Sequence, residues 1–142
     1  MKNVFTNILK HFFKEIRDKV KKNYGLTNTE MEIMNIFWES GKRFAFKELL
    51  EYSNKILGKE WKKQTLSTYL TNLQKMNLLD VDASGKNYIY FALCSKDEYI
   101  HQWTKKLVKT TFDNSICKLV VAFTGGKKLS KEEAEELRKL IE

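Results

Sequence analysis

The chain has 142 residues, of which 42% are hydrophobic, and this composition supports a folded core and excludes an intrinsically disordered protein. The net charge of +8 comes mostly from residues 1–25, with seven basic and two acidic side chains, so charge alone does not establish nucleic-acid binding. No run approaches the roughly 18 apolar residues of a membrane span, and Lys10 and His11 interrupt any signal-peptide core, so we expect a cytoplasmic protein.

Residue types that serve catalysis or metal binding are few and scattered. Cys94 and Cys117 have no Cys or His close in sequence, and His11 and His101 are isolated as well. These spacings fit no zinc or copper motif, so we interpret the cysteines as buried thiols and expect no metal and no cofactor. The chain contains no Ser/His/Asp or Cys/His set and no glycine-rich phosphate loop. The sequence therefore predicts that the protein is not an enzyme.

Residues 2–22 are predicted to form a basic amphipathic helix. Its apolar stripe has helical spacing and consists of Val4, Phe5, Ile8, Leu9, Phe12, Ile16 and Val20. Gly25 offers a left-handed cap, so we assign residues 1–25 to an N-terminal extension. Packing against the protein itself or a dimer mate is the favoured interpretation. DNA contact, or membrane contact through residues 1–22, stays open.

Two further helices open the segment 26–95. The run from Thr27 to Glu30 matches a capping box, and the helix that follows carries regularly spaced apolar residues until Ser40-Gly41 ends it. A second helix is predicted from Phe46 to Ile56. Its inward residues are predicted to be Leu49, Leu50 and Ile56, and Gly58 closes it.

A third helix, within residues 61–78, has two unlike faces. Leu66, Leu70 and Leu73 recur at helical spacing, and Met76 extends this apolar stripe toward the core. The opposite face is polar and basic and contains no acid: Lys62, Lys63, Gln64, Thr65, Ser67, Thr68, Thr71, Asn72 and Lys75. Hydroxyl and carboxamide groups can bind base edges, and lysines can neutralise phosphates. This helix is therefore the candidate DNA-reading helix.

Alternating apolar residues between Leu79 and Ala92 predict a two-stranded hairpin, with a turn at residues 84–87 and Tyr88 and Tyr90 in its second strand. Three helices followed by a hairpin make a winged helix-turn-helix, in which the second helix of the pair enters the major groove. Lys86, at the tip of the wing, can reach a flanking phosphate. Winged helices also serve as protein-interaction modules without sequence-specific DNA binding, and this alternative stays open.

Residues 96–142 are predicted to form three short helices, the first after a Ser95/Glu98 capping box and the last after Ser130. Helices of this length cannot bury their apolar surface alone, so we expect them to pair with a second copy. The predicted dimerisation residues are Trp103, Leu107, Ile116, Leu119, Val120, Phe123, Leu137, Leu140 and Ile141. The predicted fold is thus mainly α with a small β-hairpin. It comprises a winged-helix domain over 26–95 and a helical dimerisation domain over 96–142.

Three runs resemble the penicillinase repressor (BlaI/MecI) family, in order and at family-like spacing: LTNTEMEIMNIFWESG, EWKKQTLSTYLTNLQKMNLLD and FDNSICKLVVAF…LSKEEAEELRKLI. The likeness covers residues 26–142. It implies a homodimeric repressor of β-lactam-resistance or related genes that binds a dyad operator. It also implies relief of repression through a membrane sensor protease.

The resemblance also implies roles for individual residues. The cleavage site of the family would fall between Ala122 and Phe123, where Ala122 replaces the usual Asn. Ser67 and Asn72 stand where staphylococcal members of the family have arginines, whereas Thr65 and Thr68 match. We therefore expect a different or weaker operator, with some phosphate binding shifted to Lys62, Lys63 and Lys75.

Overall fold

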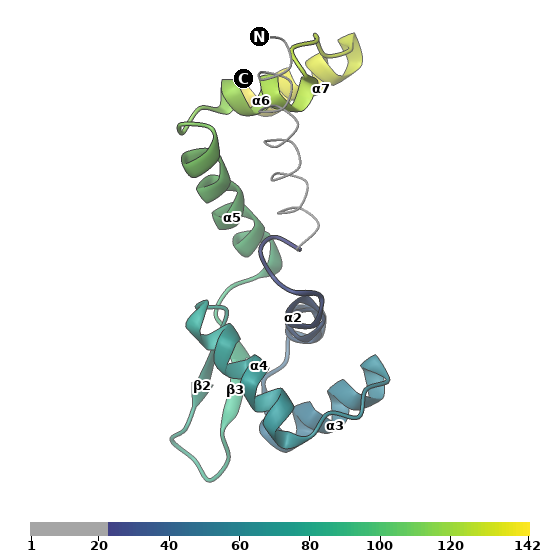
Figure 1. Cartoon of the computed structure of the whole chain (residues 1–142), viewed down its shortest axis with the longest axis vertical. Coiled ribbons are helices and arrows are strands. Elements are labelled where there is room, and N and C mark those ends of the chain that lie inside the picture. Colours follow the sequence, from purple (N-terminus) through teal and green to yellow (C-terminus); the bar gives the residue numbers. More distant parts are fainter. Residues whose placement is uncertain (1–22) are drawn as a thin grey trace, which may run out of the picture. The chain divides into compact units, whose positions relative to one another are not determined.

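The computed structural model describes residues 23–142, which form six helices and three short strands (Figure 1). In chain order they are α2 (Asn28–Ser40), β1 (Phe44–Ala45), α3 (Phe46–Leu57), α4 (Lys63–Lys75), β2 (Leu79–Asp82), β3 (Ile89–Ala92), α5 (Lys96–Thr111), α6 (Ile116–Thr124) and α7 (Lys131–Ile141). The mainly helical winged-helix fold predicted from the sequence is confirmed. The amphipathic helix predicted for residues 2–22, with its membrane alternative, lies outside the described residues.

Local signals in the sequence set both ends of α2. The Thr27 hydroxyl accepts a hydrogen bond from the Glu30 backbone N–H at 3.1 Å, and the Glu30 carboxylate accepts one from the Thr27 N–H at 3.0 Å. This is the predicted capping box, and it satisfies two N–H groups that have no partner within the helix. At the other end, Gly41 takes the left-handed conformation with φ of 62°, which favours glycine. The predicted start and stop of this helix are confirmed.

The wing is a three-stranded antiparallel sheet in the order β1-β3-β2. The predicted hairpin is confirmed, with Val81 paired to Tyr90. Phe44 of β1 also pairs with Tyr90, which adds a strand that the sequence analysis did not predict. Tyr88, predicted in the second strand, instead precedes it and is exposed, because the bend between the strands runs from Ser84 to residue 87.

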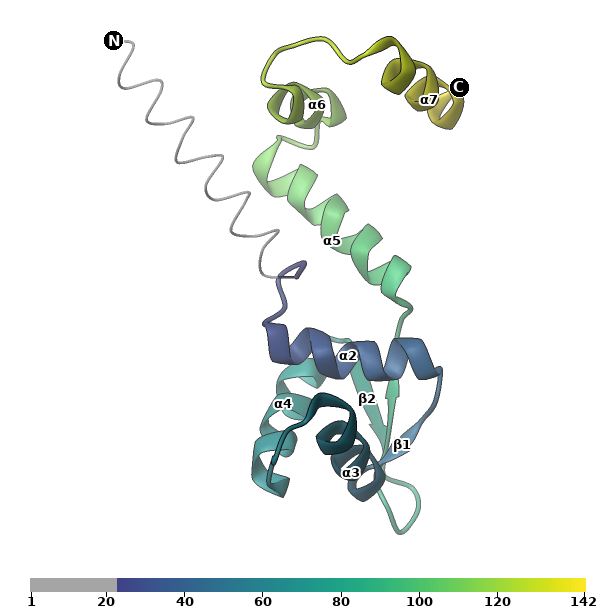
Figure 2. The same cartoon turned by 90° about the vertical axis from the view of Figure 1, so that its right-hand side faces the viewer.

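One apolar core holds α2, α3, α4 and the sheet together in the first compact unit, which ends at Ile100 (Figure 2). The three leucines of α4 are fully buried in it, as their spacing predicted. The other fully buried apolar side chains are Leu26, Ile33, Met34, Phe37, Leu49, Leu78 and Leu79. Burying these side chains supplies the main driving force for folding and fixes the orientation of α4 about its axis.

Two residues predicted to face this core are exposed. Ile56 is 57% exposed, because in the last turn of α3 it is Leu57 that packs against the core. Met76 is exposed because α4 ends at Lys75, and the positive φ of 58° at Asn77 turns the chain so that Leu78 enters the core instead. Both predictions extended a helical pattern past the point where the helix leaves the core.

Aromatic contacts attach the start of α5 to the first unit. The Trp38 indole N–H donates to the carbonyl of Cys94 at 2.9 Å, and the Trp38 ring stacks on that of Tyr99 with centroids 6.0 Å apart. The Tyr99 hydroxyl donates to the carbonyl of Tyr24 at 2.5 Å, and burial raises the pKa of this hydroxyl, so it remains a donor at neutral pH. The division into units therefore falls inside α5, after Ile100, five residues past the predicted boundary at residue 95.

The second unit, from His101 onward, contains the rest of α5 and the helices α6 and α7. The Ser115 hydroxyl caps α6, and a second capping box, between Ser130 and Glu133, starts α7. Val108 and Phe112 are buried in this unit, whereas α6 and α7 each lack a buried residue. None of the helices in residues 23–142 combines the length and the apolar character needed to cross a membrane.

Candidate nucleic-acid interface

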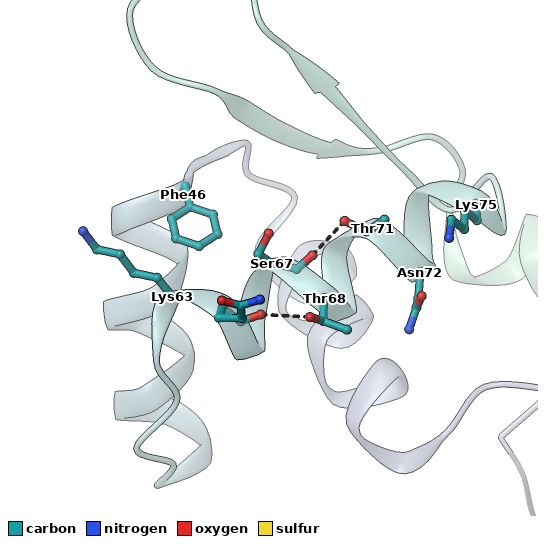
Figure 3. Close-up of a pocket in the computed structure, with 8 residues that line it drawn as sticks. Phe46, Lys63, Ser67, Thr68, Thr71, Asn72 and Lys75 are labelled. Carbon is teal, nitrogen blue, oxygen red and sulfur yellow. Dashed lines mark hydrogen bonds between the residues drawn. The ribbon is translucent and has the colours of Figure 1, made fainter.

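The polar face of α4 forms one wall of an open groove (Figure 3). Leu66, Leu70 and Leu73 lie on the opposite side of the helix, in the core. The groove brings together seven of the predicted DNA-binding residues, and all seven are exposed: Lys63, Gln64, Ser67, Thr68, Thr71, Asn72 and Lys75. Because the buried leucines prevent α4 from rotating about its axis, these seven side chains all point away from the core.

Three predicted residues lie elsewhere. Lys62 is the N-cap residue of α4, and its side chain makes no capping hydrogen bond, so it is free to extend from the start of the helix. Thr65 is exposed on the flank of α4, outside the groove lining. Lys86 is exposed in the bend between β2 and β3. These residues could meet only the margins of a ligand that filled the groove.

The charge on this face is positive at both ends and neutral in the middle. Lys63 and Lys75 are the first and last residues of α4, and no acidic residue lies between them. With a rise of 1.5 Å per residue, their Cα atoms are about 18 Å apart along the helix axis. Two lysines at that separation could neutralise phosphates on either side of the base edges that face the middle of the helix.

Two threonines in the groove use their hydroxyl hydrogens within α4 (Figure 3). Thr68 Oγ1 donates to the carbonyl of Gln64 at 3.0 Å, and Thr71 Oγ1 donates to the carbonyl of Ser67 at 2.9 Å. Such bonds to the preceding turn of the helix are common for threonine. They leave the carboxamides of Gln64 and Asn72 and the hydroxyl of Ser67 as the uncharged donors of this groove.

A second hollow continues the groove toward the wing, and the two share Phe46 and Lys63. Lys47 of α3 and Asn87 and Tyr88 of the wing also line it, so α4 and the wing border one continuous surface. Glu48 and Glu51 line it as well, which gives this hollow side chains of both charges. Sequence reasoning missed Phe46, Lys47 and Tyr88, because an apolar residue at a helix start suggests a core position and isolated surface residues carry no periodic signal.

The hairpin bend beside this hollow is fixed by a carboxylate. Asp82 accepts hydrogen bonds from the Ser84 hydroxyl at 2.6 Å and from the Ser84 backbone N–H at 2.9 Å. These bonds lower the pKa of Asp82, and the positive charge of Arg43 adds to the effect. Arg43 lies 4.0 Å from the Asp82 carboxylate and 4.2 Å from the centre of the Phe91 ring. These contacts therefore hold the start of the bend in one conformation.

The predicted dimerisation residues lie in the second unit, on α5, α6 and α7. Ile116 is 72% exposed, Phe123 84%, Leu140 83% and Ile141 71%, and Leu137 is exposed to a lesser degree. Trp103, Leu107, Leu119 and Val120 are half-buried. At the predicted cleavage site, Ala122 is half-buried beside the exposed Phe123 in the last turn of α6.

The two cysteines differ in their surroundings. Cys94 is partly buried, and burial raises the pKa of its thiol, with a further contribution from Glu98. Cys117 is exposed on α6, so its prediction as a buried thiol is wrong: it lies on the outer side of a helix that buries no residue. Within residues 23–142, no group of His, Cys, Asp and Glu side chains could hold a metal ion.

Comparison with known proteins finds similarity along most of the chain. A sequence model of the family described as penicillinase repressor matches residues 26–142. The methicillin resistance regulatory protein MecI of Staphylococcus aureus is 27% identical over 120 residues, which cover 84% of this chain and 95% of that protein. The penicillinase repressor of Bacillus licheniformis is 24% identical over 126 residues, which cover 87% of this chain and 94% of that protein. The family model covers residues of both units and begins at residue 26, after the N-terminal extension.

Proposed function

Because the chain belongs to the penicillinase repressor family, we propose that it is a dimeric transcriptional repressor that binds a dyad operator through α4. The observation that carries this proposal is the exposed, acid-free polar face of α4, held outward by three buried leucines. The regulated genes are proposed to be β-lactam-resistance or related genes, since the relatives carry the names penicillinase repressor and methicillin resistance regulatory protein.

On this proposal, the residues on and around α4 have two roles. Lys63 and Lys75, with Lys62 beside the groove and Lys86 on the wing, bind phosphates and set the register on the duplex. Gln64, Ser67, Thr68, Thr71 and Asn72 face base edges in the major groove. Thr65 contacts the margin of the site. A carboxamide that binds a base in two places discriminates by about 1–3 kcal/mol.

Dimerisation is proposed to occur through the second unit. Its four most exposed apolar side chains, on α6 and α7, would be covered by the same face of a second copy. Homodimer formation also suits the size of the reading helix, since 13 residues span little more than one half-site. Two copies would bind two half-sites separated by a helical turn of DNA, or by a multiple of it.

Relief of repression is proposed to follow cleavage between Ala122 and Phe123 by a membrane sensor protease. The bond lies in the last turn of α6, a nine-residue helix that ends at Thr124 and is capped by Gly125. Short helices are only marginally stable on their own, so this turn could unwind to fit a protease site. Mass spectrometry of the repressor from β-lactam-treated cells should then detect a fragment that ends at Ala122. Derepression with the chain still intact would contradict this step.

Operator binding is best tested by fluorescence anisotropy of the full chain on dyad DNA from its own upstream region, with scrambled DNA as the comparison. We expect competitor-resistant binding of one dimer per dyad. Gln64→Ala should weaken it, whereas Gln102→Ala, which removes an exposed glutamine of α5, should not. Equal binding to both DNAs that disappears with added salt would contradict the proposal. That result would favour the alternative of a winged helix that serves a protein partner.

A further inference from the structure

The groove on α4 contains apolar groups among its polar ones. Phe46, the first residue of α3, is only partly buried, and its ring lies in the groove beside Lys63 and Ser67 (Figure 3). It also lines the neighbouring hollow toward the wing, so the ring borders both halves of the continuous surface. An aromatic ring in this position offers a hydrophobic contact to a ligand in the groove.

The threonines of the groove add methyl groups to this apolar strip. Each hydroxyl is turned back to a carbonyl of the preceding turn, at 3.0 Å for Thr68 and 2.9 Å for Thr71. Both residues are exposed. Since the hydroxyl hydrogen is already used, the part of each side chain left for a partner is its methyl group and an acceptor oxygen. Thr68 and Thr71 therefore present apolar surface where their residue type suggests donors.

The hydrogen-bonding groups of the same groove favour one kind of base pair. Its two carboxamides, of Gln64 and Asn72, suit adenine, which offers an acceptor at N7 and a donor at N6. The groove lining includes no arginine, the residue that most often reads guanine. Its lysines stand at the two ends of α4, where phosphates are the nearer targets. Thymine, the partner of adenine, carries a C5-methyl group that suits an apolar contact.

We propose that this groove selects A·T pairs in the major groove through thymine C5-methyl groups. Phe46 and the methyl groups of Thr68 and Thr71 provide the apolar contacts, and the carboxamides bind the paired adenines. Phe46 is thus a specificity residue contributed by α3. This inference rests on the proposed operator binding and adds the chemical basis of its sequence preference.

The test replaces thymine by uracil, which removes only the methyl group. Half-sites would first be selected by the full chain from a randomised dyad library, and each thymine of the selected site would then be exchanged in turn. A contacted methyl is about one buried carbon, so its loss in one half-site should weaken binding about fourfold, and in both half-sites about sixteenfold. The salt dependence of binding should not change, because no phosphate contact is altered.

Matched variants assign the effect to side chains. Thr68→Ser keeps the hydroxyl and removes the methyl group, so it should lose the thymine preference at one position. Thr68→Val keeps a methyl group and should retain it. Phe46→Ala should lose the preference at another position. Because the Phe46 ring also lies 6.3 Å from that of Tyr90, a thermal melt must accompany this variant, and Thr68→Ser tests the proposal on its own if Phe46→Ala is unstable.

The possible failures are distinguishable. Specific dyad binding with equal affinity for thymine and uracil at every position would overturn the methyl-contact inference and leave the repressor proposal standing. Selection of G·C pairs across the half-site would do the same. Failure to select any dyad would instead contradict operator binding itself.

Discussion

Phe123 offers a direct test of the proposed dimer interface. Its side chain is 84% exposed in the single chain, so truncating it removes little from the fold of the chain itself. Full burial of such a side chain contributes about 1.5–3 kcal/mol. Phe123→Ala removes most of this side chain, so we expect each copy to lose about 2 kcal/mol of dimerisation free energy. In a symmetric dimer both copies lose it, and about 4 kcal/mol corresponds to a roughly thousandfold weaker dimer.

Sedimentation equilibrium of the full chain from nanomolar to micromolar concentration would measure this change. The matched control is Ile56→Ala, which truncates another apolar side chain that is 57% exposed but lies on α3 in the first unit. The control should leave the dimer constant unchanged. Equal dimer constants for the wild type and Phe123→Ala would refute the assignment of this face. A wild-type chain that stays monomeric at every concentration would refute the dimer.

Three further predictions concern the fold that positions α4. Leu70→Ala should destabilise the first unit by about 2–5 kcal/mol, since this leucine is buried, and chemical denaturation would show it; a smaller loss would contradict its core position. Thr27→Ala should cost about 1 kcal/mol in the same assay, because it removes the N-cap of α2, and Thr29→Ala, two residues after the cap, should cost less. The lowered pKa of Asp82 stabilises the folded state above the ordinary carboxyl pKa, and this contribution is lost as the pH falls through the lowered value. Asp82→Asn should therefore be less stable than the wild type at neutral pH, and the difference should shrink below about pH 4; a difference that persists there would contradict the role of the carboxylate.

The sequence predicted those parts of the fold that depend on residues close together in the chain or on a repeating pattern. The capping box at Thr27 acts within four residues, and the leucines of α4 repeat at the helical period, so both can be recognised in the chain itself. Strand β1 could not be predicted in this way. It has only two residues, too few to show alternation, and it exists because Phe44 pairs with Tyr90, far away in the sequence.

The same distinction applies to the candidate site. The polar face of α4 follows from its own sequence, and the structure gathers seven of its predicted residues in one groove. The contribution of Phe46 depends instead on how α3 packs beside α4, and no local pattern indicates it. Helix ends were the weakest predictions: Ile56 and Met76 both continue an apolar spacing, but both side chains are exposed. Periodicity describes a helix face, whereas the neighbouring elements decide where that face stops being buried.

On the proposed function, the cleavage site and the dimer interface act on one quantity, the affinity for the dyad. A cut after Ala122 separates Phe123 and the whole of α7, with Leu140 and Ile141, from the winged-helix domain. The remaining chain keeps α4 and its core, so each half-site contact survives the cut. The linkage between two reading helices is lost, and with it the gain of about 10²–10⁴ that bivalent binding provides over a single module. A single cut in the second unit could therefore release the operator without any change in the residues that read it.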